Sequence, residues 1–225
     1  MNWMLPPSAS TYAGEIDGLY YMILVITGIA FVIVEVGLLW FLIAYRSRPG
    51  RRARYTHGNN TAEIVWTAVP AVVVVIIGLM SGGVWMRIKG RDSAPANAIP
   101  IRMLAKQFEW HVTYPGPDGR LDTADDFQLR NQLHVPAGRP VNLRLEAEDV
   151  IHSFFVPAFR VKQDAVPGMH IPVWFEATTP GQYEIACAEL CGLGHYRMRG
   201  MVTVHAGDAY EQWLRDAPTS VALAR

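Results

Sequence analysis

Two long apolar runs in the N-terminal part of the chain restrict most strongly what it can fold into. The first extends from Leu19 to Tyr45 with Glu35 as its only charged residue, and the second, from Ile64 to Met86, has none. Each is long enough to cross a hydrocarbon core of about 30 Å as a helix. Acidic residues precede the first run and no small-residue cleavage site follows promptly, which does not fit a cleaved signal peptide. We therefore predict a transmembrane hairpin over 19–89, with helices at about 19–45 and 64–86.

Charge in the segment that joins the two runs predicts how the chain crosses the membrane. Five arginines stand there, at positions 46, 48, 51, 52 and 54. Cytoplasmic loops carry an excess of lysine and arginine, so we expect loop 46–60 in the cytoplasm. Segment 1–18 and the whole chain after residue 89 would then be extracytoplasmic, as would both termini. Because the first span follows the start of the chain directly, we expect the inner membrane of a bacterial cell.

The rest of the chain has the pattern of an all-β domain. A stretch rich in small residues and proline, 90–100, predicts a linker. Short runs with β-branched or aromatic residues follow, separated by Pro-Gly turns, at 101–114, 127–135, 140–146, 150–156, 170–177, 182–187 and 200–205. This spacing favours an antiparallel sandwich or barrel over 101–207. Residues 208–225 are predicted to form a C-terminal helix and tail, with Asp208 as N-cap.

Four soft or borderline metal ligands stand close together near the end of the predicted domain. They are Cys187, Cys191, His195 and Met198. Thiolate, thioether and imidazole donors together select copper over calcium, magnesium or manganese, and a structural zinc site rarely uses methionine. The alternative is a disulfide between the only two cysteines, which is common in exported proteins. The histidine, the methionine and the two glycines between them favour the metal site, because glycine lets a loop fold tightly around an ion.

Several further motifs accompany this run in a fixed order. They are Ala-Glu-Ile-Val-Trp-Thr-Ala-Val-Pro (62–70), Lys-Gln-Phe-Glu-Trp (106–110), Glu-Asp-Val-Ile-His-Ser-Phe-Phe-Val-Pro (148–157) and Lys-Gln-Asp-Ala-Val-Pro-Gly (162–168). With two membrane spans and a β domain, the chain resembles subunit II of cytochrome c oxidase over nearly its whole length. The resemblance implies a two-helix transmembrane hairpin followed by an all-β, cupredoxin-like (Greek-key) extracytoplasmic domain.

The resemblance also implies a dinuclear copper centre, called CuA, and assigns its ligands. Cys187 and Cys191 would bridge two copper ions through their thiolates. One copper would be completed by His152 and Met198, and the other by His195 and the backbone carbonyl of Glu189. From the residues alone, His152 could instead be a core histidine in an apolar strand. We favour it as a ligand because the copper loop itself lacks a second imidazole.

As a function, the resemblance implies the subunit through which electrons enter a proton-translocating oxidase. Electrons from cytochrome c or a similar small donor would pass from CuA to haem in the catalytic subunit I, which reduces oxygen to water. Haem would be held only in partner chains, subunit III would be a further partner, and membrane lipid but no nucleic acid would be bound. Two alternatives stay open: the CuA subunit of a nitric oxide reductase, and a copper chaperone. A thioredoxin-type chaperone would need alternating strands and helices.

Two glutamates take roles from the same resemblance. The Glu189 carboxylate would bind a magnesium ion shared with the catalytic subunit, although one carboxylate is not a site and a solvated loop acid is the alternative. Glu63, before the second span, would lie at the mouth of a proton-uptake path. It could equally be an acidic residue that stabilises the first turn of a helix.

The surface that receives electrons differs from the family pattern. Where Gln-Trp-x-Trp is common, this chain has Phe108 in place of the first tryptophan and keeps Trp110. Both are candidates for electron transfer from the donor, although a strand tryptophan is more often in the core. Acidic residues predict a cationic donor, or else form solvated loops: Asp118, Asp122, Asp125, Asp126, Glu146, Glu148 and Asp149.

Overall fold

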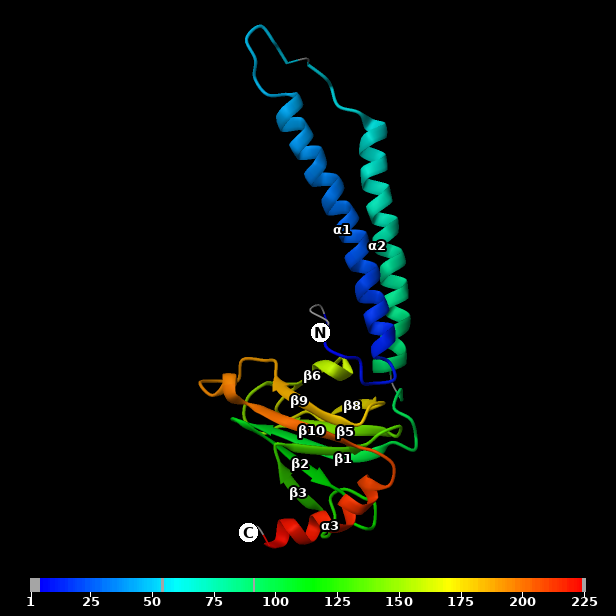
Figure 1. The fold of residues 1–225 in the computed structure, drawn as a ribbon, viewed down its shortest axis with the longest axis vertical. Coiled ribbons are helices and arrows are strands. Elements are labelled where there is room, and N and C mark those ends of the chain that lie inside the picture. The colour runs from blue at the N-terminus through cyan, green and yellow to red at the C-terminus, as the bar shows by residue number, and fades with distance from the viewer. Residues whose placement is uncertain (1–4, 54, 91, 224–225) are drawn as a thin grey trace. The chain divides into compact units, whose positions relative to one another are not determined.

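The computed structural model describes residues 5–53, 55–90 and 92–223, which form two units (Figure 1). One unit is a pair of helices within residues 15–86. The other combines the residues up to Gly14 with those from Arg87 onward. The predicted order of a helical hairpin and an all-β domain is confirmed.

Both long helices extend beyond the predicted spans. The first, α1, covers Ala13–Ala44, and α2 covers Asn60–Lys89. Each contains a stretch long and apolar enough to cross a membrane. Hydropathy predicted only the part that fits hydrocarbon, whereas the backbone stays helical through the flanking polar residues. Glu15 and Glu63 lie in the first turns, where a negative charge interacts favourably with the helix dipole.

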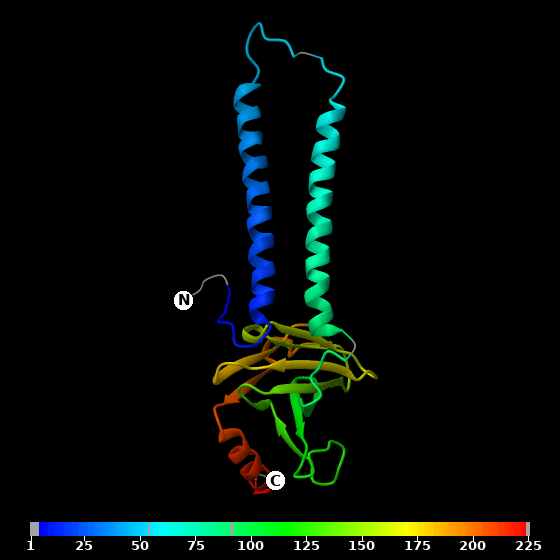
Figure 2. The same cartoon turned by 90° about the vertical axis from the view of Figure 1, so that its right-hand side faces the viewer.

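Two five-stranded sheets pack face to face in the second unit (Figures 1 and 2). One has the order β3-β2-β1-β5-β8, formed by β1 (Ile99–Lys106), β2 (Glu109–Tyr114), β3 (Phe127–Arg130), β5 (Pro140–Ala147) and β8 (Ile171–Glu176). The other has the order β4-β10-β9-β6-β7, formed by β4 (Gln132–Pro136), β6 (His152–Val156), β7 (Val161–Ala165), β9 (Gly181–Cys187) and β10 (Arg199–His205).

The strand pairing differs from the predicted antiparallel pattern in two places. β1 pairs with β5 in parallel, and β10 pairs with β4 in parallel. Local sequence spacing does not reveal these pairs, because their strands are far apart in the chain. The fold is a sandwich, with alternate residues of each strand, such as Trp110, Val112 and Tyr114 of β2, turned into a shared core.

Two predicted strands are each divided, and one strand was missed. The run 101–114 turns at residues 107–108 into β1 and β2, and the run 127–135 divides at Asn131 into β3 and β4. Asn131 adopts a left-handed conformation with φ of 58°, which interrupts an extended strand. Its side chain accepts a hydrogen bond of 2.8 Å from the Trp110 amide. The missed strand is β7, whose three central residues are polar, so that it lacks apolar alternation.

Residues 9–12, which lie within the predicted extracytoplasmic segment 1–18, form an N-terminal strap on the β unit. The Ala9 carbonyl accepts a 2.9 Å hydrogen bond from the Thr178 amide, and Ser10 Oγ donates to the Phe159 carbonyl at 2.8 Å. The side chain of Tyr12 is buried beside them. The sequence does not reveal these contacts, because the partners of this N-terminal strap lie about 150 residues away in the chain.

The predicted linker 90–100 is held at its first end. Lys89 Nζ donates a 2.7 Å hydrogen bond to Gln163 Oε1, and Trp174 Nε1 donates to the Ile88 carbonyl at 2.9 Å. β1 then begins at Ile99. Hydrogen bonds to the sandwich therefore lie just before the start of α1 and at the last residues of α2.

The C-terminal helix α3 (Ala209–Leu223) packs through Trp213 on aromatic side chains of the sandwich. The indole stacks on His134 with ring centres 4.2 Å apart and planes 10° from parallel, and it meets Tyr114 edge-on at 5.1 Å. His134 Nδ1 lies 3.0 Å from His205 Nε2, so one imidazole donates and the other accepts. The contact requires at least one neutral histidine.

Acidification is expected to weaken this contact between about pH 6.5 and pH 4. Burial, followed by the neighbouring His205, lowers the pKa of His134 to about 4, whereas an unfolded histidine titrates near 6.5. Below pH 6.5 the unfolded chain binds a proton that the folded chain does not, so the free energy of unfolding falls as pH falls. Thermal unfolding followed by tryptophan fluorescence tests this. His134→Phe, which can still stack on Trp213, should show a smaller pH dependence in that window, and an equal one would contradict the assignment.

Candidate metal centre

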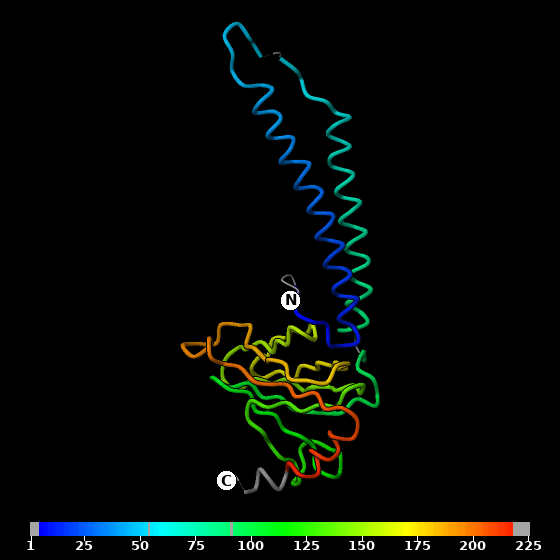
Figure 3. The backbone as a smooth tube through the Cα atoms, viewed as in Figure 1, coloured from blue at the N-terminus to red at the C-terminus, as the bar shows by residue number. Residues whose placement is uncertain are grey.

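The order of strands in the second sheet brings the predicted ligands together. Cys187 ends β9, and the loop after it returns to β10 at Arg199. His152 begins β6, which lies beside β9 through the pairing of Phe154 with Cys187. The loop projects from one end of the sandwich (orange in Figure 3). A histidine and two cysteines distant in sequence thus converge at the same edge.

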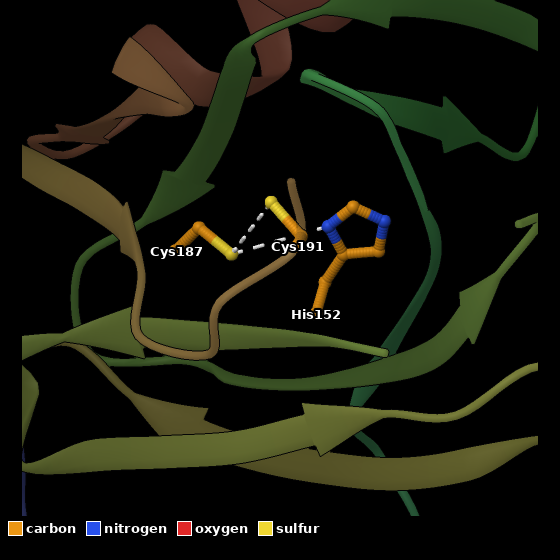
Figure 4. Close-up of side chains that lie close together, drawn as sticks. All are labelled: His152, Cys187 and Cys191. Carbon is orange, nitrogen blue, oxygen red and sulfur yellow. Dashed lines mark hydrogen bonds between the residues drawn. The ribbon is translucent and has the colours of Figure 1, made fainter. Parts of the chain in front are cut away.

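The side chains converge around two sulfur atoms (Figure 4). Cys187 Sγ and Cys191 Sγ are 3.8 Å apart, and His152 Nδ1 lies 3.9 Å from Cys187 Sγ. On the other side, His195 Nδ1 and Met198 Sδ lie 3.6 and 3.7 Å from Cys191 Sγ. The Glu189 carbonyl oxygen is 3.3 Å from Cys187 Sγ. All six predicted ligands are therefore within reach of the sulfur pair.

The cysteines are free thiols in a buried site. Their separation of 3.8 Å is well beyond the disulfide bond length of about 2.05 Å. It is nevertheless short enough for both sulfurs to bind the same metal ion, since metal–thiolate bonds measure about 2.3 Å. His152 is fully buried and Met198 is 2% exposed. Only His152, among the five side chains, comes from outside the segment 187–198.

The two thiols differ in acidity because only one lies beside His152. Burial alone would raise the pKa of Cys187. Hydrogen bonds with the His152 imidazole and with backbone groups of Glu189 and Ser153 have the opposite and larger effect, and the pKa falls to about 6. Burial and the neighbouring Cys187 thiolate raise the pKa of Cys191 to about 12. Metal binds cysteine as the thiolate, so binding of metal by both sulfurs is favoured as pH rises.

Comparison with known proteins shows the family. Sequence models of cytochrome c oxidase subunit II match its transmembrane domain to residues 1–84 and its periplasmic domain to residues 104–205. The alternative cytochrome c oxidase subunit 2 of Bradyrhizobium diazoefficiens is 32% identical over 99% of this chain and 87% of its own length. The chain belongs to the cytochrome c oxidase subunit II family. Cytochrome c oxidase subunit 2 of Cereibacter sphaeroides is 34% identical over 94% of this chain and 78% of its own length.

A solved structure supports the fold of the β unit of this subunit II. The periplasmic domain of subunit II of cytochrome oxidase from Bradyrhizobium japonicum is 28% identical, with a TM-score of 0.51 over 57% of this chain and 99% of that domain. The cupredoxin-like fold predicted from the sequence is therefore confirmed. This chain is the subunit of a haem-copper cytochrome c oxidase, an oxidoreductase complex, through which electrons enter. The reductase and chaperone alternatives are not favoured.

Asp149 is a residue of this subunit II site that the sequence analysis did not recognise. His152 Nε2 lies 2.8 Å from Asp149 Oδ1, as for an imidazole N–H that donates to a carboxylate. The other oxygen, Oδ2, accepts a 2.8 Å hydrogen bond from the Gln107 amide. This arrangement turns His152 Nδ1 toward the sulfurs and fixes its tautomer. In the sequence, the signal is an acidic residue three positions before the histidine, where charge alone predicts donor steering.

Removing Asp149 is expected to weaken copper binding by about tenfold to a hundredfold, as for other residues that orient a metal-bound histidine. Asp149→Ala leaves His152 Nε2 without its acceptor, so the ring can rotate. Competition with a copper chelator on the purified protein measures the change. Asp126→Ala, which removes the same charge from the exposed loop after β2, should bind copper like the wild type. Equal losses of copper affinity in both variants would mean that the removed negative charge, and not the orientation of His152, causes the loss.

The two aromatic candidates for electron transfer occupy different environments in this subunit II. Trp110 is fully buried, with its ring centre 6.3 Å from that of His152, so it is a core residue and offers no surface to a donor. Phe108 is half-buried and lies against the copper loop. Gln107 Nε2 beside it donates a 2.5 Å hydrogen bond to the Cys191 carbonyl.

The two glutamates with roles suggested by the family lie in separate units. Glu189 is exposed in the copper loop, with its carbonyl toward Cys187. Glu63 lies in the first turn of α2, where the Asn59 side chain accepts a 3.1 Å hydrogen bond from the Ala62 amide and caps the helix. A negative charge in this first turn also interacts favourably with the helix dipole, which is a structural role that Glu63 can have.

Proposed function

We propose that the site binds two copper ions as the CuA centre of the oxidase. The proposed ligands are His152, Cys187, the Glu189 carbonyl, Cys191, His195 and Met198. The observation that carries this proposal is the pair of free sulfurs 3.8 Å apart, each with its own imidazole. A single ion would leave some of these donors unused, whereas two ions that share both thiolates use all of them.

The donor set fits copper on chemical grounds. Two thiolates, a thioether and two imidazoles form a soft set, which suits copper rather than magnesium or calcium. When bound, the copper pair supplies one-electron redox chemistry. The protein contributes a rigid, largely dry setting, since His152, Cys191 and Met198 are buried and Asp149 holds His152. Ligands fixed by packing move little when the charge of the site changes.

Copper stoichiometry with an electron-spin spectrum of the purified chain tests the proposal. We expect two copper ions that share one unpaired electron. A single copper of ordinary mononuclear type, or zinc, would contradict it. The number of copper ions for each unpaired electron distinguishes this centre from a mononuclear copper site, which would have one ion for each unpaired electron.

We further propose that Glu189 contributes its carboxylate to a magnesium ion shared with subunit I. Its exposure, with the carbonyl turned to the copper site, supports two separate roles for one residue. Carboxylate oxygen is a preferred ligand of magnesium. Manganese can be substituted for magnesium in the assembled oxidase, and its bound amount measured. We expect Glu189→Gln to lose this manganese while its copper spectrum stays unchanged. Retained manganese would exclude the carboxylate as a ligand.

The proposed assembly contains subunits I and III, with Glu63 at the proton-uptake side. The chain would lie in a bacterial inner membrane with both termini and the β unit extracytoplasmic, as the five arginines of the loop between the helices support. Cytochrome c or a similar small redox protein would supply the electrons. In reconstituted vesicles, Glu63→Gln is expected to slow turnover, and unchanged turnover would count against the proton role.

A further inference from the structure

Glu35 is the only charged residue in the two apolar runs, 19–45 and 64–86. A helix rises about 1.5 Å per residue, which places Glu35 about 24 Å along the axis from Leu19 and about 15 Å from Tyr45. Hydrocarbon about 30 Å thick therefore extends to both sides of this carboxyl group. An ionisable group at such a depth is costly in lipid, and in membrane proteins it almost always faces other protein or a cavity.

The carboxyl group lies on the side of α1 opposite to the one that the chain itself covers. The half-buried apolar side chains of this span include Leu19, Met22 and Ile26. Glu35 follows Ile26 by nine residues, about two and a half helical turns, so the two side chains point in opposite directions. The neighbours of Glu35 within one or two turns on its own side are exposed, and they are Phe31, Leu39 and Leu42.

This chain supplies no charge that could balance Glu35. Its carboxyl group forms no ion pair with any residue that the structure describes. The nearest basic residue after it, Arg46, is eleven positions further along, or about 16 Å along a helix axis. The span of α2 has no charged residue, and α1 and α2 move apart toward the loop that joins them (Figure 1).

The depth of Glu35 restricts what can cover it. A lipid headgroup offers an ammonium group only at the membrane surface, about 15 Å from the middle of the hydrocarbon. A second copy of this chain offers no cation at that depth either, because neither apolar run contains a basic residue. Buried charges in proteins are paired. A basic side chain in a membrane span of a different chain meets this requirement.

We propose that Glu35 forms an ion pair with an arginine, lysine or protonated histidine in a transmembrane helix of another chain of the oxidase. That helix packs on the side of α1 formed by Phe31, Leu39 and Leu42. The inference rests on the proposed assembly with further membrane subunits. In hydrocarbon no water competes for the two charges, so the pair selects the helix that binds α1 and fixes its register along the membrane normal.

The test uses the full chain with an affinity tag, produced together with the rest of the oxidase and purified in a mild detergent. Mass spectrometry measures the amount of each co-purified membrane chain per mole of tagged chain. Glu35→Gln keeps the shape of the side chain but removes its charge. We expect it to lower the amount of one such chain about tenfold after a detergent wash, because the partner's cation is left unpaired. Glu35→Leu should lose the same chain.

Ile33→Gln is the matched control. It introduces the same amide at nearly the same depth, but two residues away on a helix, so the amide points to the other side of α1. Ile33 is exposed, as Glu35 is, so neither change opens a cavity within the chain. The control should change the amount of the co-purified chain less than about twofold. An equal loss in both glutamine variants would show that a polar amide in this span is harmful by itself, and would overturn the proposal.

Further outcomes also decide the proposal. An unchanged amount of partner chain in Glu35→Gln would reject an ion pair, and an unchanged or larger amount in Glu35→Leu would show that the carboxyl group faces lipid. Replacing the basic residue of the lost chain with leucine should restore co-purification with Glu35→Leu, since both charges then leave the contact. Failure of every basic residue in its spans to do so would contradict the pairing. A wild-type chain that purifies without any other membrane chain would reject the proposed assembly, and the ion pair with it.

Discussion

Replacing Cys187 or Cys191 with serine is expected to abolish the shared-electron spectrum and to stop electron transfer from the donor to haem. Each sulfur has donors of the site on its own side, and the two sulfurs are 3.8 Å apart. Serine offers a hard hydroxyl that remains protonated at neutral pH, so it cannot bridge two copper ions as a thiolate does. Spin resonance and copper analysis of the purified variants measure the loss.

Met198→Leu is the matched comparison for these variants. Leucine keeps the volume of the buried side chain, which is 2% exposed, but removes the thioether sulfur. This variant is expected to retain two copper ions and both bridging thiolates while its reduction potential shifts. A cysteine variant with an unchanged spectrum, or a leucine variant that loses all copper, would contradict the assigned roles.

Gly194→Ala is expected to destabilise the β unit by about 1–3 kcal/mol, the usual cost of overpacking. The added methyl group would lie 2.4 Å from Phe108 Cδ2 and 2.6 Å from Cγ. The backbone at Gly194, with φ of −91° and ψ of 7°, is accessible to alanine, so the loss would come from the ring contact alone. Chemical denaturation of the metal-free protein measures it.

Phe108→Ala provides the control, because it removes the ring that the new methyl group meets. In the double variant the alanine at 194 should cost little beyond Phe108→Ala, so the two changes should be clearly non-additive. Additive losses would show that position 194 is intolerant of alanine for another reason. Such a result would also weaken the evidence that Phe108 and the copper loop form one packed contact.

Most of the chemistry of the site could be predicted because its residue types stand close together in sequence. Cys187, Cys191, His195 and Met198 lie in one loop, and their donor atoms alone indicate copper. The membrane spans could also be predicted from local sequence, since each is a continuous apolar run. The helix ends could not be predicted in this way, because the helices continue through polar residues that hydropathy excludes.

Features that depend on distant contacts could not be predicted. Asp149 stood out only as a negative charge until its hydrogen bond to His152 became visible, and Arg197 contacts the Phe108 ring, 89 positions earlier in the chain. The N-terminal strap and the parallel pairs β1–β5 and β4–β10 share this property. Charge counted along the sequence predicted a cationic donor, but it could not show which acidic residues pair with basic side chains in the fold, as Asp122 does with Arg144 and Glu148 with Lys106.

The pairing of β10 with β4 has a consequence for how the protein is made. β10 is the last strand of its sheet to be synthesised, and it lies between β4 and β9 in the finished sheet. Contacts between segments so far apart in the chain form late, because long loops must close first. A chain released before Arg199 would carry every proposed copper ligand, yet the strand that anchors the end of their loop would be missing. The loop that bears the proposed ligands is therefore anchored at both ends only after β10 has paired with β4 and β9.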